Sequence, residues 1–204
     1  MSQPDIDYLN TSHHVGLVKE KFFTYDQPFK MERGTLDDFT LAYETYGELN
    51  SSSNNAVLIC HALTGDHHVA GIYSENDKKP GWWTHVVGPG KAIDTNKFFV
   101  VCSNCLGACK GSTGPSSKKA DGETYGMSFP DLSILDMVRA QKLLLGYLGV
   151  SKLFAVVGGS MGGMQALQWI VEYPEFSEKA IIIAATAQHT VQTIAFNEAG
   201  RRSI

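Results

Sequence analysis

A serine at position 160 is the residue whose surroundings most clearly indicate chemistry. Residues 158–162 read GGSMG, a Gly-x-Ser-x-Gly pattern that follows an apolar run and precedes a helical one. This context predicts a nucleophile elbow, in which Gly158 and Gly162 are needed because a Cβ at either position would meet neighbouring backbone. The pattern therefore predicts acyl transfer through Ser160, although a glycine-rich turn that only packs a strand on a helix stays open as an alternative.

An acyl-transfer serine also needs N–H donors for the oxyanion that forms on attack. The backbone N–H of Met161, directly after the serine, is the first candidate. The second candidate is the backbone N–H of Leu63, in the loop that follows the apolar run 56–60. His61 lies on the wrong loop for a general base in this fold, so we expect it to orient the Leu63 loop through hydrogen bonds.

Metal binding is a weaker interpretation of the other reactive side chains. The candidates are three histidines and three cysteines, namely His61, His67, His68, Cys102, Cys105 and Cys109. The histidine spacing does not resemble a known zinc helix, and the cysteine trio has no fourth ligand nearby. We expect no metal, and we expect the cysteines to be buried thiols that pack in the interior.

The acid and base that would complete a catalytic triad are not evident. In this fold the expected order is Ser, then Asp or Glu, then His. No Asp follows Ser160, and the only later histidine, His189, comes directly after the next apolar run, which is too early for the base. We therefore expect the chain to be the front part of a longer enzyme, inactive by itself, with the acid and base downstream of Ile204.

The elements that would position Ser160 are predicted by the hydrophobic pattern. Four short apolar runs predict parallel strands covered on both faces, at residues 56–60, 98–102, 153–157 and 180–185. An alternating pattern at 39–46 predicts a further, half-exposed strand. Together they predict an α/β fold with a mostly parallel sheet and helices on both faces.

Helices are expected between these strands. Residues 131–148 have helical spacing, and Ser133 with Asp136 resembles a capping box at the start. A second helix is expected through 164–172, and a helix or loop through 190–204. Two long loops leave the carboxyl ends of strands, where the ligand crevice of such a sheet lies.

Composition excludes several classes of protein. The chain has 204 residues, is 43% hydrophobic, and carries 17 Lys+Arg against 21 Asp+Glu, for a net charge of −4. It shows no basic stripe for nucleic acid, no apolar run of the roughly 18 residues that span a membrane, and no signal-peptide pattern. Few cysteines favour a reduced, cytoplasmic location. We expect a polar segment at 1–15 and one domain portion over 16–204.

Several longer strings resemble the homoserine O-acetyltransferase family. They are YETYGELN at 43–50, CHALTGDHHVAG at 60–71, GWW at 81–83, GPGKAIDT at 88–95, GSTGP at 111–115 and GSMGGMQA at 159–166. The resemblance implies an α/β-hydrolase fold, incomplete at its C-terminal end. It matches the family's nucleophile to Ser160 and its oxyanion donors to the backbone of Leu63 and Met161, with the triad Asp and His downstream.

The same resemblance implies an activity and its partners. The enzyme would move an acetyl group from acetyl-CoA to the hydroxyl of L-homoserine through an acyl-serine, in methionine biosynthesis. Acetyl-CoA would be a co-substrate, with no cofactor, and the full-length protein would be a homodimer. A serine or homoserine O-succinyltransferase of the same family, an α/β-hydrolase esterase, and a non-catalytic binding protein on the same scaffold remain open.

Overall fold

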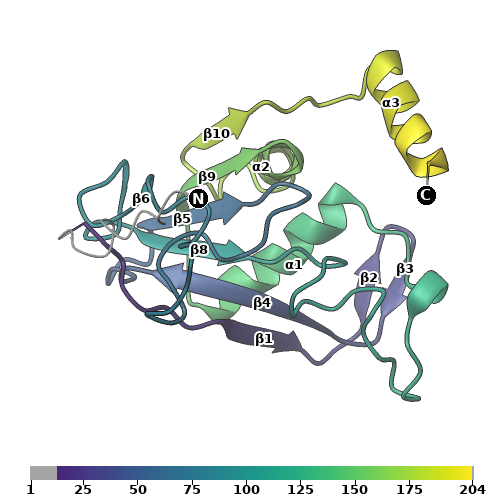
Figure 1. Ribbon diagram of the computed structural model, residues 1–204, viewed down its shortest axis with the longest axis horizontal. Coiled ribbons are helices and arrows are strands. Elements are labelled where there is room, and N and C mark those ends of the chain that lie inside the picture. The colour runs from purple at the N-terminus through teal and green to yellow at the C-terminus, as the bar shows by residue number, and fades with distance from the viewer. Residues whose placement is uncertain (1–12, 204) are drawn as a thin grey trace.

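A six-stranded sheet organises residues 13–203, the part of the chain that the computed structural model describes (Figure 1). In sheet order the strands are β1 (Lys21–Tyr25), β4 (Phe39–Tyr46), β8 (Phe99–Ser103), β5 (Ala56–Cys60), β9 (Leu153–Gly159) and β10 (Ala180–Ile183). The last four run parallel to one another, and β1 and β4 are antiparallel to their neighbours. The predicted strands are therefore confirmed, with small shifts at their ends. The expectation that the strand at 39–46 is half-exposed is wrong, because β4 lies inside the sheet between β1 and β8 and six of its eight residues are buried.

Two small strand pairs, one antiparallel and one parallel, and a short 3₁₀ turn lie outside this sheet. The pairs are β2 (Phe29–Met31) with β3 (Gly34–Leu36), and β6 (Val87–Gly88) with β7 (Ile93–Asp94). The turn, η2, spans Gly126–Ser128. β6 and β7 lie between β5 and β8, and η2 lies between β8 and α1. These are the two long connections that are expected to be loops.

The first helix, α1 (Ile134–Tyr147), begins with the expected capping box. The Ser133 hydroxyl accepts a hydrogen bond from the Asp136 N–H at 3.1 Å, and the Asp136 carboxylate accepts one from the Ser133 N–H at 3.0 Å. The helix thus starts three residues later than the predicted 131, because Asp131 and Leu132 precede the N-cap.

The other helices are α2 (Met161–Glu172) and α3 (Val191–Arg202). α2 starts earlier than the predicted 164, immediately after Ser160. Gly162 and Gly163 are poor helix formers, so the sequence pattern does not indicate that the helix begins before them. Because they have no side chains, they allow the helix to lie close to the sheet.

The core has two parts, one on each face of the sheet. α1 and α2 cover one face, where Leu144, Leu145 and Trp169 are fully buried. The opposite face is covered by the stretch between β5 and β8, through Val69 and Val87. The α/β architecture is confirmed, but in the described residues α1 and α2 both lie on one face, and a long, mostly irregular segment covers the other.

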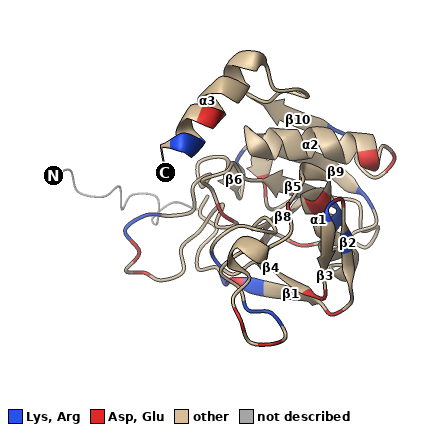
Figure 2. Ribbon diagram, turned by 90° about the vertical axis from the view of Figure 1, so that its right-hand side faces the viewer, with Lys and Arg blue, Asp and Glu red and all other residues tan. Residues whose placement is uncertain are grey.

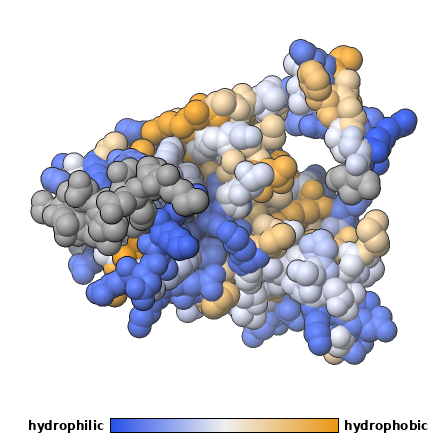
Figure 3. All heavy atoms as spheres, viewed as in Figure 1, coloured by the Kyte–Doolittle hydropathy of each residue, from blue (hydrophilic) through white to orange (hydrophobic). Residues whose placement is uncertain are grey.

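β10 does not meet the expectation that each apolar run forms a strand covered on both faces of the sheet. Ile181, Ile182 and Ile183 are 51%, 36% and 44% exposed, and apolar atoms gather over this strand (Figure 3). The reason is its position: within the described residues β10 is the outermost strand on its side of the sheet, next to β9. α3 follows on an extended connection and stands apart from the sheet, with no buried residue (Figure 1).

The N-terminal prediction falls mostly on residues 1–12, which lie outside the described residues. Of its remainder, the His13 ring bonds the Pro89 carbonyl oxygen at 2.9 Å, and Val15 packs against the second core cluster. The boundary after residue 15 stays a prediction. Lys and Arg are interspersed with Asp and Glu along the described chain (Figure 2). No helix in that part of the chain is long and apolar enough to cross a membrane.

Candidate active site

Ser160 lies at the junction of β9 and α2, in a backbone conformation that non-glycine residues rarely adopt. Its φ is 56° and its ψ is −122°, and its N–H donates to the Ile183 carbonyl oxygen at 3.0 Å. Such a conformation costs about 1–3 kcal/mol and persists only where surrounding structure imposes it. Here β9, β10 and α2 together hold the turn.

The two predicted elbow glycines are required by close backbone approach. A Cβ at Gly162 would lie 2.7 Å from the carbonyl carbon of Cys60 and 2.9 Å from the carbonyl oxygen of His61. A Cβ at Gly158 would lie 2.9 Å from the backbone nitrogen of Gly163 and closer still to Gly162. The first turn of α2 therefore sits directly against the end of β5, where the Leu63 loop begins.

The Ser160 side chain is available for chemistry. The residue is exposed, and although it is the N-cap of α2, its hydroxyl makes no capping hydrogen bond. The first N–H groups of a helix have no acceptor within the helix, and they stabilise negative charge nearby. The Met161 N–H is one of these groups, so it suits the role of an oxyanion donor.

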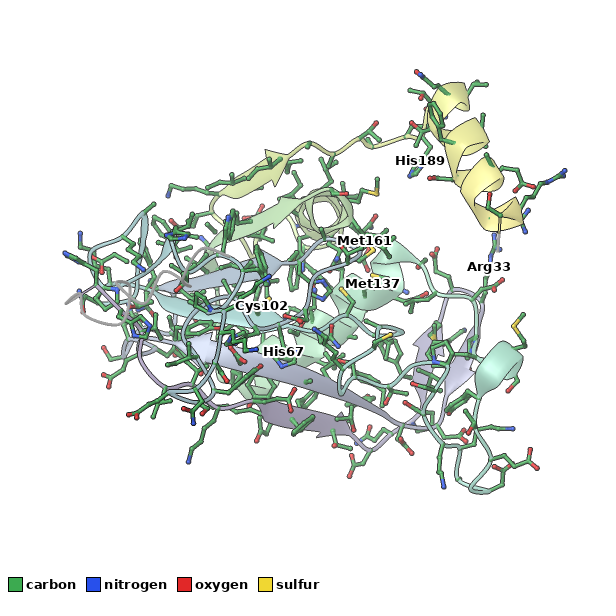
Figure 4. The ribbon with its side chains drawn as sticks, viewed as in Figure 1. Arg33, His67, Cys102, Met137, Met161 and His189 are labelled. Carbon is green, nitrogen blue, oxygen red and sulfur yellow. The ribbon has the colours of Figure 1, made fainter. Side chains whose placement is uncertain are left out.

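A pocket of about 370 Å³ lies between the Leu63 loop and the start of α2. We call it the acyl pocket; it is lined by Leu63, Thr64, Gly65, residues 105–110, Leu132, Met137 and Met161. The Met137 and Met161 side chains lie next to each other (Figure 4). Both predicted oxyanion residues thus border one cavity, and Leu63 is 76% exposed at its edge.

His61 holds the Leu63 loop through both ring nitrogens. Nε2 accepts from the Cys105 N–H at 3.0 Å, so the proton is on Nδ1, which donates to the Ala62 carbonyl oxygen at 2.8 Å. The Gly65 N–H donates to the same oxygen at 2.9 Å. In a planar trans peptide the carbonyl and the following N–H point in opposite directions, so these bonds turn the Leu63 N–H away from the ring.

Burial keeps His61 neutral in this role. The residue is 1% exposed, and burial lowers the pKa of its imidazole, an effect that the hydrogen bond to Ala62 only partly opposes. A neutral ring with one donor and one acceptor nitrogen matches the two bonds. The geometry therefore agrees with the predicted orienting role of His61.

A buried polar network ties the pocket wall to the helices. The Gln141 amide donates to the Gln165 amide oxygen at 2.7 Å and accepts from the Trp169 indole N–H at 2.8 Å. The Gln165 amide nitrogen lies 3.4 Å from the Cys105 sulfur. All four side chains are at most 2% exposed. This network fixes Cys105, whose N–H in turn holds His61; its glutamines were not singled out from the sequence.

The expectation that the cysteine trio is buried is wrong for Cys109. Cys102 and Cys105 are buried, and burial raises the pKa of both thiols, that of Cys105 to about 12. Both Cys105 and Cys109 follow β8 and line the pocket, but Cys105 packs against the buried Gln165, whereas Cys109 lies farther along the loop and is exposed.

His67 and His68 contact carboxylates on the far side of the Leu63 loop. His67 Nε2 lies 2.9 Å from Glu20, and His68 Nδ1 lies 3.2 Å from the buried Glu44. Glu44 also accepts from the Tyr73 hydroxyl at 2.6 Å. Within residues 13–203, no three His, Cys, Asp or Glu side chains are grouped so as to hold a metal.

His189 does not join the elbow. It lies in the exposed connection between β10 and α3, apart from Met161 (Figure 4). The described residues thus place the predicted nucleophile, Ser160, directly before Met161, which lines one pocket together with Leu63, the other predicted oxyanion residue. The general base and its acid are not among the residues grouped there.

Comparison with known protein families identifies the fold. A family model described as "alpha/beta hydrolase fold" matches residues 55–201. Curated relatives named homoserine O-acetyltransferase include those of Methanococcoides burtonii, 57% identical over 192 residues, and Geotalea uraniireducens, 51% identical over 192 residues. Each match covers 93% of this chain, but 39% and 52% of the relative. The chain therefore spans about half or less of the length of these relatives.

Solved structures give the same picture. A homoserine O-acetyltransferase from Bacillus anthracis is 39% identical with a TM-score of 0.81, over 86% of this chain and 48% of that one. A protein named esterase E22 is 38% identical with a TM-score of 0.83, over 90% of this chain and 52% of that one. The chain is thus similar both to an acetyltransferase and to an esterase.

Proposed function

We infer, from the premise that this chain belongs to the α/β hydrolase fold family, that the whole protein transfers an acetyl group from acetyl-CoA to the hydroxyl of L-homoserine. The observation that carries the proposal is the exposed Ser160 at the strand–helix junction, beside a pocket bordered by Leu63 and Met161. The relatives named homoserine O-acetyltransferase, 51% to 59% identical, support the choice of acyl group and acceptor.

In the first step the Ser160 hydroxyl oxygen attacks the thioester carbonyl carbon. The C–S bond breaks, CoA leaves as the thiol, and an acetyl-serine remains. The N–H groups of Leu63 and Met161 stabilise the oxyanion, and losing one such donor typically costs about 3 kcal/mol of transition-state stabilisation. The hydrogen bonds of His61 contribute by directing the Leu63 N–H.

In the second step the homoserine hydroxyl attacks the acetyl-serine carbonyl, which releases the O-acetyl amino acid and regenerates Ser160. Both steps need a general base, and we assign this to residues of the whole protein outside the described part. The acceptor must also outcompete water, so its alignment against the acyl carbon provides much of the rate.

An esterase is the second candidate, and the similarity to esterase E22 favours it. The same elbow, pocket and oxyanion donors would serve hydrolysis, with water in place of homoserine. The two functions differ in one observable, namely whether acyl transfer depends on the amino acid.

The deciding experiment follows CoA thiol release from acetyl-CoA by the whole protein, with and without L-homoserine. We expect release that depends on homoserine, and its loss in Ser160→Ala. Rapid release without any amino acid would favour the esterase, and preference for succinyl-CoA would favour the O-succinyltransferases. Unchanged turnover in Ser160→Ala would exclude the serine mechanism altogether.

The cellular setting is part of the same proposal. Methionine biosynthesis and a homodimer follow from the family resemblance, and the small number of cysteines supports a cytoplasmic location. Co-purification of CoA-dependent activity with a dimer-sized peak in gel filtration would test the homodimer.

A further inference from the structure

One ion pair stands at the edge of the acyl pocket, formed by Lys110 and Asp66. The Lys110 ammonium donates to one carboxylate oxygen of Asp66. The other oxygen accepts from the His68 N–H at 2.9 Å. Lys110 lines the pocket and Asp66 directly follows Gly65 of the pocket lining, so the pair lies at the edge of the pocket beside the Leu63 loop.

The lysine is placed there by its backbone. Lys110 has φ 66°, a left-handed conformation unusual for a side chain of this kind, and the buried Asn104 amide donates to its carbonyl oxygen at 2.9 Å. Asn104 also donates to the Cys109 carbonyl oxygen. The side chain of Asn104, which is 1% exposed, thus fixes the backbone at one end of the pocket wall.

Among the described residues that line the acyl pocket, Lys110 is the one with a full charge, and Asp66 neutralises it. Asp66 is held as an anion, because the bonds from Lys110 and His68 lower the pKa of its carboxyl more than burial raises it. Lys110 also borders a second cavity of about 460 Å³, whose other ionisable residues include Glu20 and Asp66. Beyond the pair, Glu20 is the carboxylate that lines this cavity, together with His67, His68 and Tyr73.

From this arrangement we propose that Asp66 determines the acyl specificity of the site, admitting uncharged acyl groups and disfavouring those that end in a carboxylate. The inference rests on the proposed acyl transfer at Ser160. A free lysine in the wall would attract an acyl carboxylate, whereas a lysine already paired offers it no unsatisfied charge. Specificity of this kind is a difference in affinity between two ligands. Here the acyl group that ends in a carboxylate binds less well because it finds no free positive charge.

The test compares two esters that differ by one carboxylate, p-nitrophenyl acetate and mono-p-nitrophenyl succinate, with the whole protein. Ser160 takes the acyl group, the aryl ester bond breaks, and p-nitrophenolate release is measured. In Asp66→Asn we expect the succinate-to-acetate ratio of kcat/KM to rise about fivefold, the scale of a partly exposed charge pair. In the double variant Asp66→Asn with Lys110→Gln, the ratio should return to the wild-type value.

A charge-matched control is Asp94→Asn, which removes an acid that lines neither cavity. An equal rise in this variant would overturn the inference, because the effect would then come from net charge alone. An unchanged ratio in Asp66→Asn, or a rise that persists in the double variant, would also overturn it.

A second measurement does not require turnover. In the Ser160→Ala background, the ratio of dissociation constants for succinyl-CoA and acetyl-CoA should fall about fivefold on Asp66→Asn. A protein that binds both donors but does not transfer to homoserine would contradict the proposed function, while the binding ratio would still decide the role of Asp66.

Discussion

Replacing Gly162 by alanine is the sharpest test of how the elbow is built. The new Cβ would lie 2.7 Å from the Cys60 carbonyl carbon and 2.9 Å from the His61 oxygen, where ordinary contact begins near 3.4 Å. Since both neighbours are backbone at the end of β5, no side chain can rotate away. The start of α2 and the Leu63 loop must separate, by about 1 Å when the closer Cys60 oxygen is included.

We expect two measurable results from this displacement. Overpacking of this kind costs about 1–3 kcal/mol of the free energy of unfolding. A shift of about 1 Å between the nucleophile and the oxyanion donors costs on the order of 10²-fold in kcat/KM. Thermal unfolding followed by circular dichroism gives the first quantity, and acetyl transfer by the whole protein gives the second.

Gly146→Ala is the matched control. Gly146 lies in the last turn of α1, and an added Cβ there meets nothing within 4 Å. Alanine is the better helix former, by at most about 1 kcal/mol, so this variant should be equally or slightly more stable and fully active. If Gly162→Ala behaved like Gly146→Ala, with activity and stability retained, the close packing of α2 against β5 would not be what holds the site.

Two further predictions concern the cap and the buried histidine. Ser133→Ala removes the hydroxyl that accepts from the Asp136 N–H, and should lower the free energy of unfolding by about 1 kcal/mol in chemical denaturation; no loss would show that the capping box contributes nothing. Because burial lowers the pKa of His61, the unfolded chain binds a proton here more readily than the folded one. Stability due to His61 is therefore complete above its ordinary pKa of 6.5 and declines as the pH falls toward the lowered value. Denaturation measured between about pH 7 and pH 5 should show this slope, and His61→Gln should flatten it; an unaltered slope in His61→Gln would assign it to other groups.

Many of the strands and helices could be predicted because the patterns that indicate them involve residues close together in the sequence. The apolar runs at 56–60 and 153–157 became β5 and β9, and the Ser133–Asp136 spacing located the start of α1 to within three residues. The elbow was predictable for the same reason, since its strand, turn and helix are contiguous in the chain.

The features that could not be predicted depend on contacts between residues that lie far apart in the sequence. The run 180–185 has the composition of a covered strand, and only the sheet order shows that β10 is an edge. Lys110 and Asp66 are 44 positions apart, and nothing in either local pattern indicates that they pair. The network of Gln141 and Gln165 likewise arises only when α1 and α2 pack side by side.

The different exposure of the four cysteines makes Cys109 a site for selective chemical labelling. Cys60, Cys102 and Cys105 are buried, and Cys109 is exposed in the wall of the acyl pocket. A maleimide dye should therefore attach within this chain at one position, because alkylation requires an accessible thiolate. A fluorophore there would report directly on occupancy of the cavity, so ligand titrations could be read without any catalytic event.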